Sequence, residues 1–129
     1  MSKAMLKVIE DSMTELGINY EFKKWTAKPE YPYFTGEYQE DEPFNEDGEQ
    51  GIQFILNGFG RGESALVDLE NAKEKIKAYF PKVGGRLVTT ESGSVVAIFY
   101  ASSFNNLPTG DAELERIQIN LTVKEWSVN

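Results

Sequence analysis

The chain has 129 residues, a formal net charge of −8, and 40% hydrophobic and 12% aromatic residues. This length predicts one domain with a hydrophobic core, and the composition excludes a wholly disordered chain. The acidic balance disfavours a binder of duplex nucleic acid or of an anionic membrane surface, because both depend mainly on Lys and Arg.

Two residue types are missing from the sequence, and their absence narrows the possible chemistry. Without Cys there is no disulfide or thiolate nucleophile, and without His there is no imidazole base, Ser-His-Asp triad or usual zinc site. The first residues lack the pattern of a signal peptide, and no apolar run approaches membrane-spanning length. We therefore expect a soluble, cytoplasmic protein that is poorly equipped for catalysis and needs no metal or cofactor.

The first predicted element is an amphipathic helix that ends at Gly17. Apolar side chains recur three and four residues apart between Met5 and Leu16, and Ser2 is the expected N-cap. We expect this apolar stripe to pack on the protein's own sheet. The alternation that follows from Tyr20 to Trp25 predicts a strand.

A second strand is predicted from Tyr31 to Glu37, where prolines and aromatics are concentrated. Prolines favour the start of a strand or a sheet edge, so we expect this strand to be exposed. Its aromatic residues favour a protein interface over base stacking, because the surrounding acidic residues would repel a nucleic-acid backbone.

Residues 37–49 form an acidic segment with seven carboxylates and no base. It contributes −7 to the net charge, so the rest of the chain carries only −1. We predict a loop over residues 37–50, which is either a solvated spacer or an electrostatic contact for a neighbouring subunit. A surface cation site is an alternative, but Pro43 and Phe54 stand where an EF-hand needs oxygen ligands.

The next two predicted elements are a strand from Gly51 to Phe59 and a helix from about Ser64 to Tyr79. Glycines in the intervening run, GFGRG, are expected to give a tight and flexible turn into the helix. A phosphate-binding loop is the alternative, but the fuller glycine fingerprint is missing. Ser64 is the expected N-cap, and Pro81 should end the helix.

Three strands are predicted in the last third of the chain. A short strand covers Arg86 to Glu91, and Ser94 to Phe104 is apolar on both faces, which predicts a central strand. Strict alternation from Arg116 to Lys124 predicts the clearest strand, with a bulge or strand end near Lys124.

The predicted fold class is α+β, in the order α-β-β-β-α-β-β-β. Strands grouped on either side of a helix favour a largely antiparallel sheet with two helices packed on one face. We find no repeat and no linker, so residues 1–129 are predicted to form a single domain.

Several segments resemble the tail-terminator or tail-completion proteins of long-tailed bacteriophages and prophages. These segments are the N-terminal helix, PYFTGEY, EDGEQG, the helix ending AYFP, and the closing LPTGDAELERIQINLTVKEW. The resemblance covers nearly the whole chain. It implies a structural protein of the virion tail, assembled in the host cytoplasm.

Such proteins form a ring, usually hexameric, that ends polymerisation of the tail tube and presents a surface to the head connector. The resemblance therefore implies three partners: other copies of this chain, the tail tube protein and the head connector protein. The resemblance brings no catalytic residues, while the composition predicts no enzymatic activity, no recognition of nucleic-acid sequence and no membrane contact.

We expect the ring contacts to use aromatic edge residues, the acidic segment, and basic residues opposite it. The 105–112 loop and nearby arginines are the expected complement of the acidic segment. The candidate interface residues are Tyr31, Tyr33, Phe34, Tyr38, Glu40, Asp41, Glu42, Glu46, Asp47, Arg61, Arg86 and Arg116. The alternatives are a head-tail joining or minor tail protein and, in another class, a small host module that binds a ligand or peptide.

Overall fold

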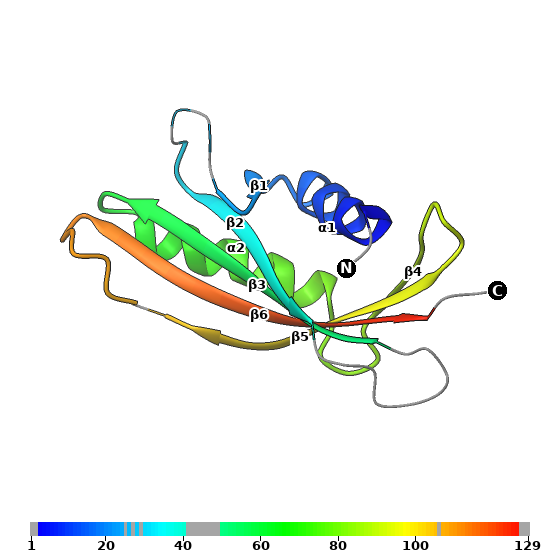
Figure 1. The fold of residues 1–129 in the computed structure, drawn as a ribbon. Helices are drawn as coiled ribbons and strands as arrows, with labels where there is room; N and C mark the ends of the chain where they lie inside the picture. Colours follow the sequence, from blue (N-terminus) through cyan, green and yellow to red (C-terminus); the bar gives the residue numbers. More distant parts are fainter. Residues whose placement is uncertain are drawn as a thin grey trace.

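A computed structural model describes residues 3–24, 26, 28, 30–40, 50–105 and 107–126. Over these residues the chain forms two helices and six strands (Figure 1). They are α1 (Lys3–Glu15), β1 (Tyr20–Phe22), β2 (Tyr33–Glu40), β3 (Gln50–Arg61), α2 (Ala65–Tyr79), β4 (Arg86–Thr89), β5 (Val95–Phe104) and β6 (Leu114–Trp126).

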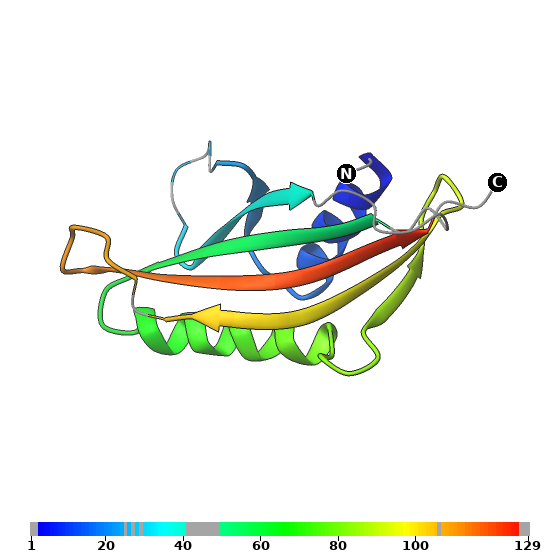
Figure 2. The ribbon, with the colours of Figure 1, turned by 60° about the horizontal axis from the view of Figure 1, so that its bottom comes forward.

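The six strands form one sheet in the order β1-β2-β3-β6-β5-β4. Only β1 and β2 run parallel, and every other neighbouring pair of these strands is antiparallel. Figure 2 shows the long strands β2, β3, β6 and β5 side by side. The prediction of an α+β fold with a mostly antiparallel sheet is confirmed.

The hydrophobic core consists of every second residue of the long strands, which point to one face of the sheet, and of apolar residues from both helices. Side chains two residues apart in a strand point to the same face, and β6 supplies Ile117, Ile119, Leu121 and Val123 in this way. Helix α2 contacts β3 and β6, while α1 contacts β1. Apolar residues from both helices lie in the same cluster: Met5, Ile9, Met13, Leu69, Ala72 and Ile76.

Two glycines let aromatic rings lie directly on the sheet. A Cβ added at Gly58 would overlap the ring of Phe34, and one added at Gly36 would lie 2.6 Å from the ring of Phe54. Gly58 lies within β3, which extends to Arg61. The predicted flexible GFGRG turn is therefore wrong for its first residues, because they pair with β2 and β6.

The two helices end where the sequence indicates. Gly17 follows α1 with a φ of +72°, in the left-handed region that glycine adopts easily. Helix α2 ends at Tyr79, two residues before Pro81. Ser64 is the N-cap residue of α2, but its hydroxyl makes no capping bond and donates instead to the carboxylate of Asp68 at 2.9 Å.

Three further predictions differ from the structure. Residues 37–40 are not part of a loop, because they continue β2 and pair with β3 through Glu40. Strand β6 runs without a break to Trp126, and the bulge lies in its neighbour β5, between Tyr100 and Ser102. Strand β4 ends at Thr89, because a turn follows in which the Thr90 N–H donates to the Ser94 carbonyl.

Candidate interaction surface

The strand residues that alternate with the core form a second, mostly polar face of the sheet. We call these residues the polar face: Tyr33, Thr35, Glu37, Gln39, Gln53, Ile55, Asn57, Phe59, Arg116, Gln118, Asn120, Thr122 and Lys124. Hydrogen-bonding side chains dominate its centre, and aromatic rings lie at the end where β2 begins. A face of this composition can bind another protein through polar contacts around a few aromatic anchors.

Hydrogen bonds link the polar face from β2 to β5. The Asn57 amide donates to Glu37 Oε1 at 3.3 Å, and a guanidinium nitrogen of Arg116 donates to Asn57 Oδ1 at 2.9 Å. On the other side of β6, the Asn120 amide donates to Ser102 Oγ at 3.1 Å. These bonds hold the side chains in place before any partner arrives.

Arg116, one of the predicted interface residues, is therefore held mainly by its own chain. Among the described residues its Nε atom is buried and has no hydrogen-bond partner. An unpaired buried donor costs free energy, so this position is a weak point of the polar face.

An aromatic cluster lies where β2 begins and β3 ends. The rings of Tyr33 and Phe59 stack with centroids 5.1 Å apart, and the ring of Tyr31 lies 5.4 Å from that of Tyr33. Tyr31 is 37% exposed, and the guanidinium carbon of Arg61 lies 5.6 Å from its ring centroid. Desolvation raises the pKa of the Tyr33 phenol.

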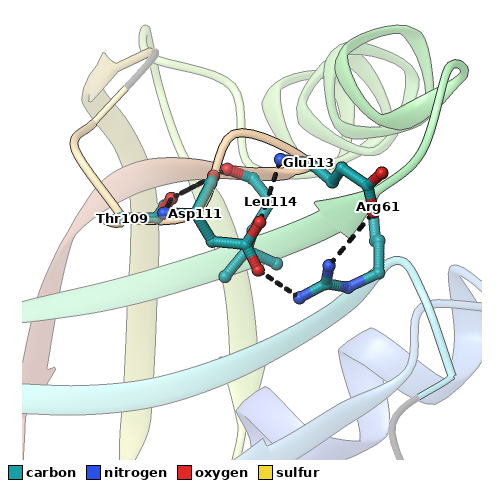
Figure 3. A network of polar contacts seen from close by, with 5 residues as sticks. All are labelled: Arg61, Thr109, Asp111, Glu113 and Leu114. Atoms are coloured by element: carbon teal, nitrogen blue, oxygen red, sulfur yellow. Dashed lines mark hydrogen bonds and ion pairs between the residues drawn. The ribbon is translucent and has the colours of Figure 1, made fainter.

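The charge of Arg61 is neutralised within the chain (Figure 3). One guanidinium nitrogen lies 2.9 Å from Asp111 Oδ2, and another lies 3.7 Å from Glu113 Oε2. The backbone N–H of Glu113 also donates to Asp111 Oδ1, and this bond together with Arg61 lowers the pKa of the Asp111 carboxyl. The expectation that the 105–112 loop and Arg61 complement the acidic segment stays a prediction, although Arg61 is already paired with Asp111 of that loop and with Glu113.

The remaining predicted interface residues lie in different places. Phe34 is fully buried in the core, so the interpretation of this residue as an interface contact is wrong. Tyr38 is 37% exposed and stacks on Phe22 with ring centroids 5.9 Å apart. Glu40 is exposed at the end of β2. Four predicted residues lie outside the described part of the chain: Asp41, Glu42, Glu46 and Asp47.

Arg86 lies on the core side of β4, beside a pocket of about 260 Å³ between α1 and β4. Its guanidinium carbon is 3.9 Å from the ring centroid of Tyr79. The Tyr79 hydroxyl donates to Glu15 Oε2 at 2.5 Å, and burial followed by this bond raises the pKa of the phenol. Both basic and acidic side chains line the pocket, so it does not favour an ion of either sign.

A larger groove of about 950 Å³ lies between α1 and β1. Leu6, Tyr20 and Phe22 supply its apolar surface, and lysines line it together with acidic residues. Burial raises the pKa of the Tyr20 phenol. This groove is larger than the pocket beside Arg86 and offers more apolar surface, which a small ligand or a peptide could contact.

Sequence reasoning missed several exposed apolar side chains. Val83 is 90% exposed, Leu87 is 68% exposed and Phe104 is 53% exposed. The alternation of side chains in the short strand β4 could have identified Leu87 as exposed. Val83 lies in a turn, where no repeating pattern of side chains predicts exposure. In the described ranges, no three acidic residues gather as a metal site, and no helix is long and apolar enough to cross a membrane.

The sequence matches no protein-family model and no curated protein.

Proposed function

We propose that this chain is a non-catalytic tail assembly protein of a bacteriophage or prophage. It forms a ring at the head-proximal end of the tail tube, ends tube polymerisation and joins the tail to the head. The resemblance in sequence motivates this proposal, and the polar face carries the structural support for it. That face spans several strands and its side chains are linked by hydrogen bonds, which is compatible with a polar protein interface.

The proposed arrangement places both helices on one face of the sheet and leaves the polar face for partners. The shared core cluster of α1, α2 and alternate strand residues supports this arrangement. The network around Arg61 fixes the loop before β6, so that loop can present a defined shape to the tail tube or the head connector.

Deletion of the gene from a phage that produces intact virions tests the proposal. We expect tail tubes of uncontrolled length that are not joined to heads, visible by electron microscopy of negatively stained lysates. Supply of the wild-type chain from a plasmid should restore tail length and infectivity. Tails of normal length joined to heads would contradict the proposal.

Two other functions predict different particles in the same experiment. A head-tail joining or minor tail protein predicts tails of normal length that are not attached to heads or lack infectivity. A host module that binds a ligand or peptide is favoured by the groove between α1 and β1, and it predicts normal virions.

A further inference from the structure

Helix α1 and strand β1 lie next to each other at one edge of the described sheet (Figure 1). Strand β1 is the first in the strand order and pairs only with β2. Its outer side therefore has no described strand against it. The groove of about 950 Å³ opens between this strand and α1, so a segment of another chain that enters the groove meets an unpaired strand.

The backbone groups of β1 alternate in direction. The carbonyl of Asn19 accepts from β2 at 2.8 Å, and the N–H of Lys23 donates to β2 at 2.7 Å. Because every second residue of a strand bonds to the same neighbour, Tyr20 and Phe22 turn their backbone groups toward the open side. The Phe22 carbonyl accepts from the Lys24 N–H at 2.9 Å. The N–H groups of Tyr20 and Phe22 and the carbonyl of Tyr20 are therefore placed to pair with a partner's backbone.

One side of the groove is apolar. Leu6 of α1 lines it together with Tyr20 and Phe22 of β1, and all three side chains are only partly buried. The ring of Phe22 is held from the core side, because it stacks on the rings of Tyr38 and Phe54 at 5.9 and 6.4 Å between centroids. An apolar side chain of a partner would cover this surface and remove it from water, which favours binding.

Most lysines around the groove lack a carboxylate partner. Four of them line it: Lys3, Lys7, Lys23 and Lys24. Lys7 lies 4.0 Å from Asp11 and 3.7 Å from Glu91. In the part of the chain that the structure describes, no ion pair joins any of the other three to an acid. Lys23 does lie 5.8 Å from the ring centroid of Phe22, which keeps its charge close to the apolar side of the groove.

The acids that line the groove are mostly engaged within the chain. Glu21 accepts the backbone N–H and the hydroxyl of Thr26 at 2.6 and 3.0 Å, and Asp11 lies beside Lys7. Glu10 is the remaining acid among the lining residues. The three lysines without an acidic partner therefore outweigh it, and the groove favours a negatively charged partner although the whole chain carries −8.

The other open stretches of strand offer less to an acidic partner. Beyond its pairing with β1, strand β2 carries Glu37 and Glu40. Residues 99–104 of β5 lie beyond its pairing with β4 and include no charged side chain. The pocket beside the β4 edge measures about 260 Å³, and its Arg86 lies 3.9 Å from the ring centroid of Tyr79. Among these edges, β1 combines open backbone groups, the larger groove and lysines without an acidic partner.

We infer that the groove between α1 and β1 binds an acidic peptide segment of another protein as an added strand. The segment pairs its backbone with Tyr20 and Phe22 and places an apolar side chain against Leu6. Its carboxylates lie near the three lysines without an acidic partner. The groove is separate from the polar face, so this inference goes beyond the proposed ring and does not depend on it.

A short synthetic peptide tests the charge of this site. The probe carries fluorescein, has glutamates at both ends and has phenylalanine and valine at alternate central positions. Fluorescence anisotropy measures its binding to the full chain, and we expect saturable binding that weakens as salt is added. A peptide with glutamine in place of every glutamate should bind at least about fivefold more weakly.

Two double variants with the same change of charge locate the site. Lys23→Gln with Lys24→Gln should weaken binding of the acidic peptide by about fivefold, because each exposed ion pair contributes only modestly. Lys77→Gln with Lys82→Gln is the matched control, since both residues are exposed and neither lines the groove. The control should bind within about twofold of the wild type.

Methylation of the peptide backbone tests the added strand. N-methyl groups on every second residue remove the N–H donors from one side of an extended peptide. We expect one of the two alternate patterns to abolish binding and the other to leave it within about twofold. The methyl groups change no charge, so this result separates strand pairing from simple attraction between charges.

Each outcome supports the inference or overturns it. No saturable binding of the acidic peptide up to about 1 mM overturns the site. Equal losses in the two lysine double variants overturn the groove as its place, and equal effects of both methylation patterns overturn the added strand. Circular dichroism confirms that each variant is folded, which the exposure of all four lysines favours. The gene-deletion phenotype decides the proposed ring separately.

Discussion

Arg61 and Asp111 lie 50 positions apart in the sequence, yet their side chains meet at 2.9 Å and tie the end of β3 to the loop before β6. The Asp111 side chain also accepts the N–H of Glu113, and Thr109 donates its hydroxyl to the carbonyls of Asp111 and Leu114. This set of bonds orders residues 109–114, just before β6 and at its start (Figure 3).

The first prediction concerns the pH dependence of this loop. The hydrogen bonds from the Glu113 N–H and from Arg61 lower the pKa of the Asp111 carboxyl in the folded state. The ionised carboxylate therefore stabilises the fold above the ordinary Asp pKa of about 4. This stabilisation is lost as the pH falls through the lowered value. We expect Asp111→Asn to lower the Tm slightly at pH 7 and by a smaller amount once the pH falls through the lowered pKa. Thermal melts from pH 7 downward measure the difference.

Glu113→Gln serves as the control for that experiment. Glu113 lies farther from Arg61, at 3.7 Å, and its side chain is 78% exposed. Its effect at pH 7 should be smaller than that of Asp111→Asn. Equal effects of the two variants, or an unchanged gap at low pH, would show that the Asp111 carboxylate does not hold the loop.

The second prediction concerns the core. Phe54 is fully buried and stacks on Phe22 with ring centroids 6.4 Å apart. Phe54→Ala removes the ring and leaves a cavity, so we expect a loss of about 3–5 kcal/mol in the free energy of unfolding. Ile119→Val, a milder core change, should cost about 0.5–1.5 kcal/mol. Urea titration measures both, and Val67→Ala at a 61% exposed position should change little.

The third prediction concerns the close approach at Gly58. An alanine there places a methyl group against the ring of Phe34 and 2.8 Å from the side chain of Ile117. We expect Gly58→Ala to lower the free energy of unfolding by about 1–3 kcal/mol. Combining it with Phe34→Leu makes room for the methyl group, so the double variant should be more stable than the sum of the single losses predicts. Additive losses would argue against the contact.

The fourth prediction concerns the polar face. Asn57 is only 8% exposed, and its amide joins Glu37 to Arg116. Asn57→Ala leaves both partners without this bond, and we expect a cost of about 1–3 kcal/mol in the free energy of unfolding. Gln53→Ala, at an exposed position of the same strand, is the control and should stay within about 0.5 kcal/mol of the wild type. A neutral Asn57→Ala would show that the network is not ordered.

Local patterns predicted most of the secondary structure. Strict alternation identified β6, spacings of three and four residues identified both helices, and Pro81 marked the end of α2. These predictions succeed because side-chain period and backbone chemistry act within a few residues. Charge was less informative for structure, since Glu37 and Glu40 continue β2 although the acidic composition predicted a loop.

The candidate interface stays a prediction, but the structure separates its residues by burial. Composition identified the aromatic residues near β2, but it could not separate buried Phe34 from half-exposed Tyr31, because both lie in the same short run. It also could not show that Arg61 is neutralised by Asp111, because a salt bridge across 50 positions has no local pattern.

The sequence by itself determined which segments form helices and which form strands, and which side chains of the long strands are apolar or polar. It also showed that the chain has no His or Cys side chain for chemistry. Only the tertiary structure decided that β6 lies between β3 and β5, and that β1 and β4 lie at the two edges of the described sheet. The physical reason is that period and propensity set which residues share a face, while strand order depends on packing between segments far apart in the chain.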